Sequence, residues 1–189
     1  EQAAQVLAFG LAMKPDMRDL NNNQAHVWVR WIEATLAAEK DTEAMELFAR
    51  AKKLMPRESD FQHPADWFAR LGQKQTKQNG IDAGLKVADR AEKVLTGEEK
   101  NRLLKWKSEL MLLASYDLLR DKDVDGALKI LIQAYAASPD ATITNGIAYF
   151  AQQSLFIVRD KSGTSAAVAH FKKLKQLFPK VKAIDDVGT

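Results

Sequence analysis

The feature that most constrains the fold of this chain is a spacing of small and large apolar residues that ends at a proline and recurs along the sequence. In the segment TEAMELFARAKKLMP, Ala44, Phe48 and Ala51 fall on one helical stripe, and Pro56 closes the segment. The spacing recurs, once with a threonine in place of the proline, at Ala3, Leu7, Gly10 and Pro15; at Gly84, Ala88, Ala91 and Thr96; at Ala127, Leu131, Ala134 and Pro139; and at Ala167, Phe171, Leu174 and Pro179. The near-constant interval between the ends of these copies, about 40 residues, predicts a helical repeat array.

The secondary structure is predicted to be helical throughout. Apolar residues recur at spacings of three and four, and the alternation typical of strands is rare, so the chain is assigned to the all-α class. Side chains that can accept hydrogen bonds from free backbone N–H groups predict helix starts at Asp41, Asp123, Thr164 and Thr96, the last with Glu99 completing a capping box. Proline cannot donate the next helical hydrogen bond, so helices are predicted to stop at Pro15, Pro56, Pro139 and Pro179.

The segments that precede two of the copies carry large residues beside small ones. WVRWIEA contains Trp28 and Trp31, and FARLG contains Phe68, Leu71 and Gly72. At these residues the sequence resembles the tetratricopeptide repeat (TPR) family. The resemblance implies an α-solenoid of stacked antiparallel helix pairs that forms a right-handed superhelix. It places a half repeat at 1–17, pairs at 25–58, 65–98, 108–141 and 148–181, a single repeat domain over 1–181, and a C-terminal tail at 182–189.

The repeat length departs from that family. TPR units are about 34 residues long, so the surplus in each unit predicts longer helices or longer turns. Another α-solenoid such as HEAT, or a non-repeating bundle, therefore remains an alternative. The last pair departs furthest, because Ala151 and Ser154 stand where large residues belong. Since the chain begins inside a second helix, we expect it to belong to a longer array or to follow another domain.

No constellation of residues predicts catalysis, so the chain is interpreted as a non-enzyme with no catalytic residue, metal or cofactor. Cysteine is absent, which excludes disulfides and thiolate chemistry. The three histidines, His26, His63 and His170, lie on different units without metal-ligand spacing. The glycines form no phosphate-binding loop.

Local clusters of polar residues have structural interpretations. FQHPADWF, which contains His63 and Asp66, is interpreted as a turn and a helix start, and DVDG as a helix cap at Asp123. Glu98 and Glu99 are expected on an exposed face at a helix start. The four tryptophans are expected in the core, with Trp67 the most exposed of them.

The charge pattern argues against general nucleic-acid binding. The net charge is only +3, and signs alternate along most of the chain. No apolar run approaches the roughly 20 residues that a transmembrane helix needs. The exception is a lysine cluster near the end, which predicts a patch for a polyanion or simply favourable charge at a helix C-terminus: Lys172, Lys173, Lys175, Lys180 and Lys182.

The predicted function is binding of a protein or peptide partner. In the TPR family, first helices line a concave groove, and the resemblance assigns this groove to His26, Glu33, Asp66, Gln73, Lys77, Glu109, Tyr116 and Arg120, with the smaller or apolar Val29, Ala37, Ala69 and Leu112. We expect a scaffold within a larger protein or multiprotein assembly. The alternatives are a rigid spacer, or docking of the lysine cluster on a polyanion or membrane surface.

Partner identity and homo-oligomerisation are left open by the sequence. The lack of cysteine and the stretches NNNQ and QKQTKQN favour the bacterial periplasm or cell envelope over the cytoplasm.

Overall fold

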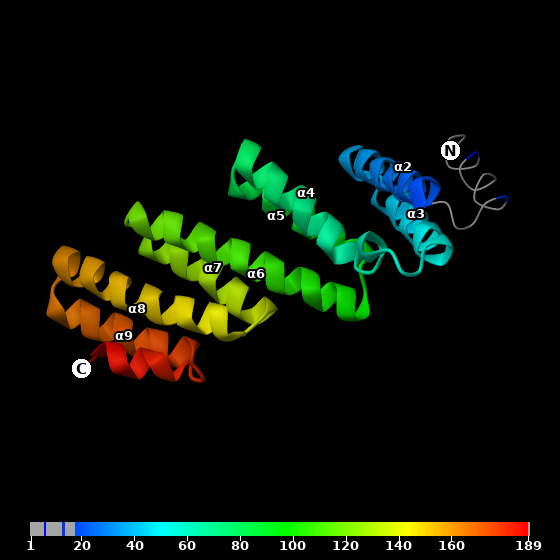
Figure 1. Cartoon of the computed structure of the whole chain (residues 1–189). Coiled ribbons are helices and arrows are strands. Elements are labelled where there is room, and N and C mark those ends of the chain that lie inside the picture. Colours follow the sequence, from blue (N-terminus) through cyan, green and yellow to red (C-terminus); the bar gives the residue numbers. More distant parts are fainter. Residues whose placement is uncertain (1–5, 7–12, 14–17, 189) are drawn as a thin grey trace. The chain divides into compact units, whose positions relative to one another are not determined.

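The protein is all α, as the apolar periodicity predicts. The computed structural model describes residues 6, 13 and 18–188, and no strand occurs in that part of the chain (Figure 1). Its elements are α2 (Arg18–Ala37), α3 (Asp41–Leu54), the 3₁₀ helix η1 (Ser59–Phe61), α4 (Pro64–Asn79), α5 (Ile81–Val94), α6 (Gly97–Arg120), α7 (Val124–Ala137), α8 (Ala141–Ser162), α9 (Thr164–Leu177) and the 3₁₀ helix η2 (Lys182–Gly188). The half repeat predicted at 1–17, including Pro15, lies outside the described residues except at Val6 and Met13.

The second helix of each pair recurs regularly. Helices α3, α5, α7 and α9 all have 14 residues. They begin at nearly constant intervals, at Asp41, Ile81, Val124 and Thr164. The stops at Pro56, Pro139 and Pro179 are confirmed, since a helix ends two residues before each. The interval predicted from the prolines is therefore the interval between real helices.

The helices that precede these four are all longer. Helices α2, α6 and α8 have 20, 24 and 22 residues, whereas α4 has 16 and follows the turn that contains η1. Helix α6 begins at Gly97 rather than at the predicted residue 108, because residues 98–107 contain neither glycine nor proline to end it. Helix α8 likewise begins at Ala141 rather than at 148.

The turns inside the pairs alternate between two types. Glu39 and Lys122 have positive φ in three-residue turns, whereas Gly80 and Gly163 form one-residue turns with φ of 87° and 85°. The glycine turns need that residue, because side chains disfavour positive φ. The start of α7 follows the start of α3 by the same number of residues as the start of α9 follows that of α5. The same number of residues separates Glu39 from Lys122 and Gly80 from Gly163. The helix boundaries thus repeat as sets of four helices.

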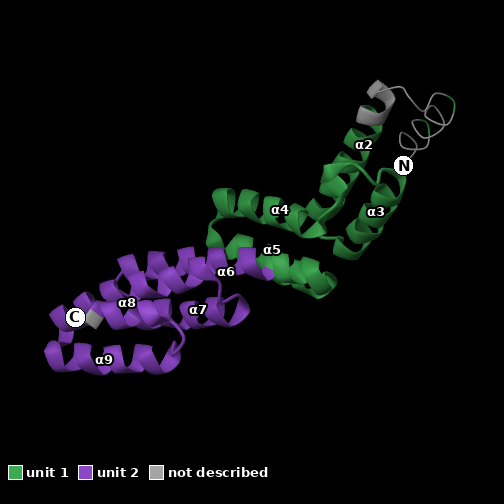
Figure 2. Ribbon diagram, turned by 60° about the horizontal axis from the view of Figure 1, so that its bottom comes forward, with its two compact units in different colours: residues 1–103 green, residues 104–189 purple. Residues whose placement is uncertain are grey.

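The chain divides into two compact units, residues 1–103 and 104–189 (Figure 2). The boundary between the two units falls within α6. In the first unit α2 packs against α3 and α4, and α3 packs against α5 and η1. Phe48 and Phe61 meet edge to face in its core, with ring centroids 6.2 Å apart. Small residues at the predicted stripe positions, such as Ala44 and Ala51, are fully buried and let the helices approach closely.

The second unit is built around large residues of α7, α8 and α9. Leu131, Phe150 and Leu174 are completely buried in one apolar cluster. The segment assigned to a C-terminal tail is not free, because η2 packs on α8 and α9 and buries Ile184 in the same cluster. Gly146 of α8 permits a close approach to α6, since a Cβ atom there would lie 2.5 Å from Cδ1 of Leu112.

Helix caps follow the prediction at one site and depart from it at others. The Asp123 carboxylate accepts a hydrogen bond from the Gly126 N–H, as predicted. Helix α9 does begin at Thr164, but Gly163 occupies the N-cap position and provides no side-chain cap bond. Asp41 binds the Arg90 guanidinium at 2.6 Å instead of capping α3. At Asp41, the departure arises because a tertiary partner competes for the oxygen that would otherwise cap the helix.

Candidate binding groove

The first unit contains an open groove of about 570 Å³ between α2 and α4. Its lining combines apolar and charged side chains: Arg30, Glu33, Ala34, Leu36 and Ala37 from α2 and Trp67, Arg70, Leu71 and Lys74 from α4. A smaller hollow of about 160 Å³ shares Leu36, Ala37 and Leu71 and extends the groove toward Lys86 and Arg90 of α5. Apolar surface with a few polar groups is typical of binding sites.

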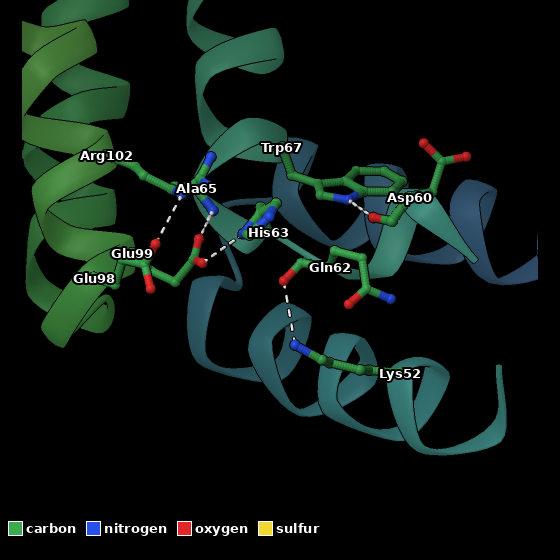
Figure 3. Close-up of polar contacts among 9 residues, drawn as sticks. All are labelled: Lys52, Asp60, Gln62, His63, Ala65, Trp67, Glu98, Glu99 and Arg102. Carbon is green, nitrogen blue, oxygen red and sulfur yellow. Dashed lines mark hydrogen bonds and ion pairs between the residues drawn. The ribbon is translucent and has the colours of Figure 1, made fainter. Parts of the chain in front are cut away.

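Trp67 forms one wall of this groove and is held rigidly. The expectation that it is the most exposed tryptophan is wrong, because only 4% of its surface is accessible. Its indole N–H donates to the Asp60 carbonyl oxygen at 2.6 Å (Figure 3). The Arg70 guanidinium lies 4.7 Å from the ring centroid. The hydrogen bond and the cation–π contact fix the edge that Trp67 presents to the groove.

The lining of the groove carries more positive than negative charge. Arg30 forms an exposed ion pair with Glu33 at 3.6 Å, and Arg70 forms one with Asp60 at 3.5 Å. No carboxylate lies within ion-pair distance of Lys74 among the residues that the structure describes. Exposed ion pairs of this kind are weak, at about 0–1 kcal/mol, so a ligand carboxylate can compete for these cations.

The structure brings only part of the predicted groove together. Glu33 and its neighbour Ala37 line the groove, whereas Asp66, Gln73 and Lys77 are exposed on α4 but do not belong to the lining. His26 is exposed on α2, also outside the lining. Sequence reasoning missed three basic residues of the lining, Arg30, Arg70 and Lys74. Arg70 and Lys74 follow Trp67 by three and seven residues, which places all three on one face of a helix, and this spacing could have identified them.

The predicted groove residues of the second unit lie along α6. Tyr116 meets Tyr149 of α8 edge to face at 5.2 Å, and burial raises the pKa of its hydroxyl, with a smaller contribution from Tyr149. Glu109 is half-buried, and the exposed Arg120 pairs with Asp117 at 2.9 Å. Tyr116 thus packs partly on α8 rather than facing solvent alone.

A polar cluster joins the start of α4 to the start of α6 within the first unit (Figure 3). The Glu99 carboxylate accepts from the Ala65 N–H at 3.1 Å and lies 2.9 Å from His63 Nδ1. The predicted capping box with Thr96 is therefore replaced by a bond to the N-terminus of another helix. The expectation that Glu99 is exposed is also wrong, because its side chain is largely buried between these partners.

One pair in the second unit resembles catalytic chemistry but is closed to a substrate. His170 Nε2 lies 2.9 Å from Ser154 Oγ, which in turn donates to the Ala151 carbonyl oxygen at 3.2 Å. Ser154 has no accessible surface, so no reacting group can reach it. Burial lowers the pKa of His170, as does Lys173, while Asp125 acts in the opposite direction.

The lysine cluster is exposed in full, at Lys172, Lys173, Lys175, Lys180 and Lys182. Lys175 pairs with Asp185 at 2.6 Å and lies over Phe171, so one of the five charges is partly compensated.

In the described part of the chain, no three or more His, Cys, Asp or Glu residues are grouped to hold a metal ion. No described helix combines the length and hydrophobicity that crossing a bilayer requires.

Comparison with known proteins gives no match. No family model, curated protein or solved structure is significantly similar to the chain.

Proposed function

We propose that the chain is a protein-interaction scaffold that binds a partner segment in the groove between α2 and α4. The observation that carries this proposal is an open groove whose lining places apolar side chains beside cations that can bind a ligand carboxylate. The groove lies on first helices, where the resemblance to TPR proteins places the binding surface. The proposal extends to a TPR-like solenoid that works within a larger protein or assembly.

The regular helix pairs support the solenoid part of the proposal. Neighbouring pairs in the first unit pack first helix on first helix and second helix on second helix. Buried alanines recur on α3, α5 and α7 at the predicted positions. Small residues at these places let helix pairs stack in the same way each time, which is how repeat arrays build a continuous surface.

The groove favours one class of partner segment. Its volume of about 570 Å³ and the apolar side chains of Ala34, Ala37 and Leu71 suit two or three apolar side chains of a peptide. Arg30, Arg70 and Lys74 add three positive charges against the single negative charge of Glu33. The complementary ligand is a segment with apolar side chains beside an aspartate or glutamate.

Selection from a displayed peptide library against the whole chain tests this function. We expect enrichment of peptides that combine apolar residues with Asp or Glu. Lys74→Glu should weaken their binding about tenfold, the loss expected for about 1.4 kcal/mol, and Ala37→Arg should fill the groove and block it. Lys77→Glu is the matched control, because Lys77 is exposed on the same helix outside the lining. Equal binding by all variants contradicts the proposal.

Docking of the lysine cluster on a polyanion is a second candidate, favoured by its five exposed lysines. It predicts binding to heparin or to anionic vesicles that falls steeply with salt and survives both groove variants. A spacer that uses neither surface predicts that no peptide and no polyanion is retained at physiological salt.

A further inference from the structure

The second unit has a different open groove, of about 470 Å³, on α8, α9 and η2. It is lined mainly by apolar side chains: Gln152, Leu155, Phe156, Arg159, Thr164, Ala167, Val168, Phe171, Asp186 and Val187. Phe156 and Val168 are 48% and 49% exposed, which is high for large apolar residues. A hollow lined by exposed apolar side chains and a few polar ones is typical of a binding site.

Helix α9 corresponds to α3 in its length and in the elements that follow it. Both helices have 14 residues, and a proline follows each by two residues. Beyond the prolines, Phe61 and Ile184 occupy equivalent positions in a 3₁₀ helix, and both are buried. Counted from the first residue of each helix, Ala44, Met45 and Phe48 of α3 correspond to Ala167, Val168 and Phe171 of α9.

On α3 the equivalent surface is covered by another helix. Pro64, Trp67 and Phe68 of α4 lie against Ala44 and Phe48, and the space left between these side chains is only about 10 Å³. Ala44 and Phe48, which also face Ile32 and Leu36 of α2, are 1% and 5% exposed. On α9 the corresponding Ala167 and Phe171 are only half-buried and line the open groove.

The same relation holds within the second unit. Ala127, Leu128 and Leu131 of α7 are buried in the cluster to which α8 contributes Ile143 and Ile147. In both cases the covering element is the helix that follows, and it presents large apolar side chains to the surface. On α9 the element that follows is η2, which contributes Asp186 and Val187 to the lining and leaves the groove open. The repeat itself therefore indicates what kind of element fits the groove.

We propose that the groove on α9 binds an amphipathic α-helix as its partner. Like Pro64, Trp67 and Phe68 of α4, the partner presents apolar residues at positions i, i+3 and i+4, at least one of them aromatic. Lys172 lies one helical turn beyond Val168 on the same face and is exposed, so an acidic residue on the flank of the partner helix is complementary to it. This site is separate from the groove between α2 and α4, and neither proposal depends on the other.

The probe for this site is a fluorescein-labelled synthetic peptide with the sequence of α4, PADWFARLGQKQTKQN, titrated with the whole chain and followed by anisotropy. We expect saturable binding that Val168→Glu weakens by about tenfold or more, because a carboxylate would have to be buried against the helix. Leu177→Glu is the matched control, since Leu177 is an exposed apolar residue of the same helix outside the lining. A peptide with Trp67→Ala and Phe68→Ala should not bind.

Two readouts separate the outcomes. Unchanged thermal unfolding of the Val168→Glu chain shows that a loss of binding comes from the groove, and Lys74→Glu should leave peptide binding unaltered. No peptide binding, or equal binding to the Val168→Glu and wild-type chains, overturns the proposal. Concentration-dependent dimerisation that Val168→Glu abolishes, without peptide binding, overturns it in favour of a second copy of this chain as the occupant.

Discussion

Replacing Arg90 by methionine should destabilise the first unit, because Arg90 ties two helix pairs together. From α5, its guanidinium donates to both carboxylate oxygens of Asp41 at 2.6 and 3.0 Å and to the Leu36 carbonyl oxygen at 3.0 Å. Glu39 adds an ion pair at 3.1 Å. The pKa of Arg90 is raised, chiefly by the hydrogen bonds to Asp41 and against the opposing effect of burial. One side chain therefore holds the end of α2 and the start of α3 to α5.

The size of the effect follows from the exposure of the pair. A hydrogen bond to a charged group contributes about 1.5–3 kcal/mol, and removing one partner of a fully buried ion pair costs about 3–5 kcal/mol. The side chains of Arg90 and Asp41 remain 19% and 13% exposed, so water screens part of the interaction. We expect the free energy of unfolding to fall by about 2–3 kcal/mol in Arg90→Met, because the Asp41 carboxylate is left without its main partner.

A double-mutant cycle in urea denaturation measures this interaction. Asp41→Asn should cost about as much as Arg90→Met, and the double variant should lose less than the sum of the two, with a coupling of at least about 1 kcal/mol. Lys86→Met on the exposed side of α5 is the control and should change stability by less than about 0.5 kcal/mol. Additive losses, or a loss in Arg90→Met no larger than in the control, would refute the bracing role of Arg90.

Other predictions concern the second unit. Gly146→Val should destabilise it by about 1–3 kcal/mol in thermal or urea unfolding, because the new side chain collides with buried Leu112; unchanged stability contradicts the close helix approach. The pKa of His170 is lowered in the folded state, so the unfolded state binds more protons as the pH falls below about 6.5, and the free energy of unfolding should decrease there. His170→Gln should flatten that pH dependence, and an unaltered slope argues against it. Asp123→Ala should cost about 1 kcal/mol by removing a cap, whereas Thr164→Ala should cost much less; equal losses contradict the cap assignment.

The second helices could be predicted from the sequence because their signals are local. Proline ends α3, α7 and α9 through its own missing N–H group, and small residues such as Ala44 and Ala127 report close packing directly. Both signals depend only on residues within a few turns. The interval between pairs therefore followed from spacing alone.

The orientation of α4 could not be predicted in the same way. A helix turns by about 100° per residue, so a shift of one position exchanges Gln73 for Lys74 at the groove. That orientation is set by tertiary contacts, including the bond from Trp67 to the Asp60 carbonyl oxygen. The same limit explains Glu99, whose partners His63 and Ala65 lie far away in the sequence.

The most direct test of the proposed function is to map where a selected peptide touches the chain. A photo-crosslinking amino acid placed at Lys74 in one variant and at Lys77 in another samples the same helix inside and outside the groove. The proposed function predicts strong crosslinking of the library-selected peptide from position 74 and little from position 77. Crosslinking from position 77 alone, or equally from both, would contradict the placement of the binding site between α2 and α4.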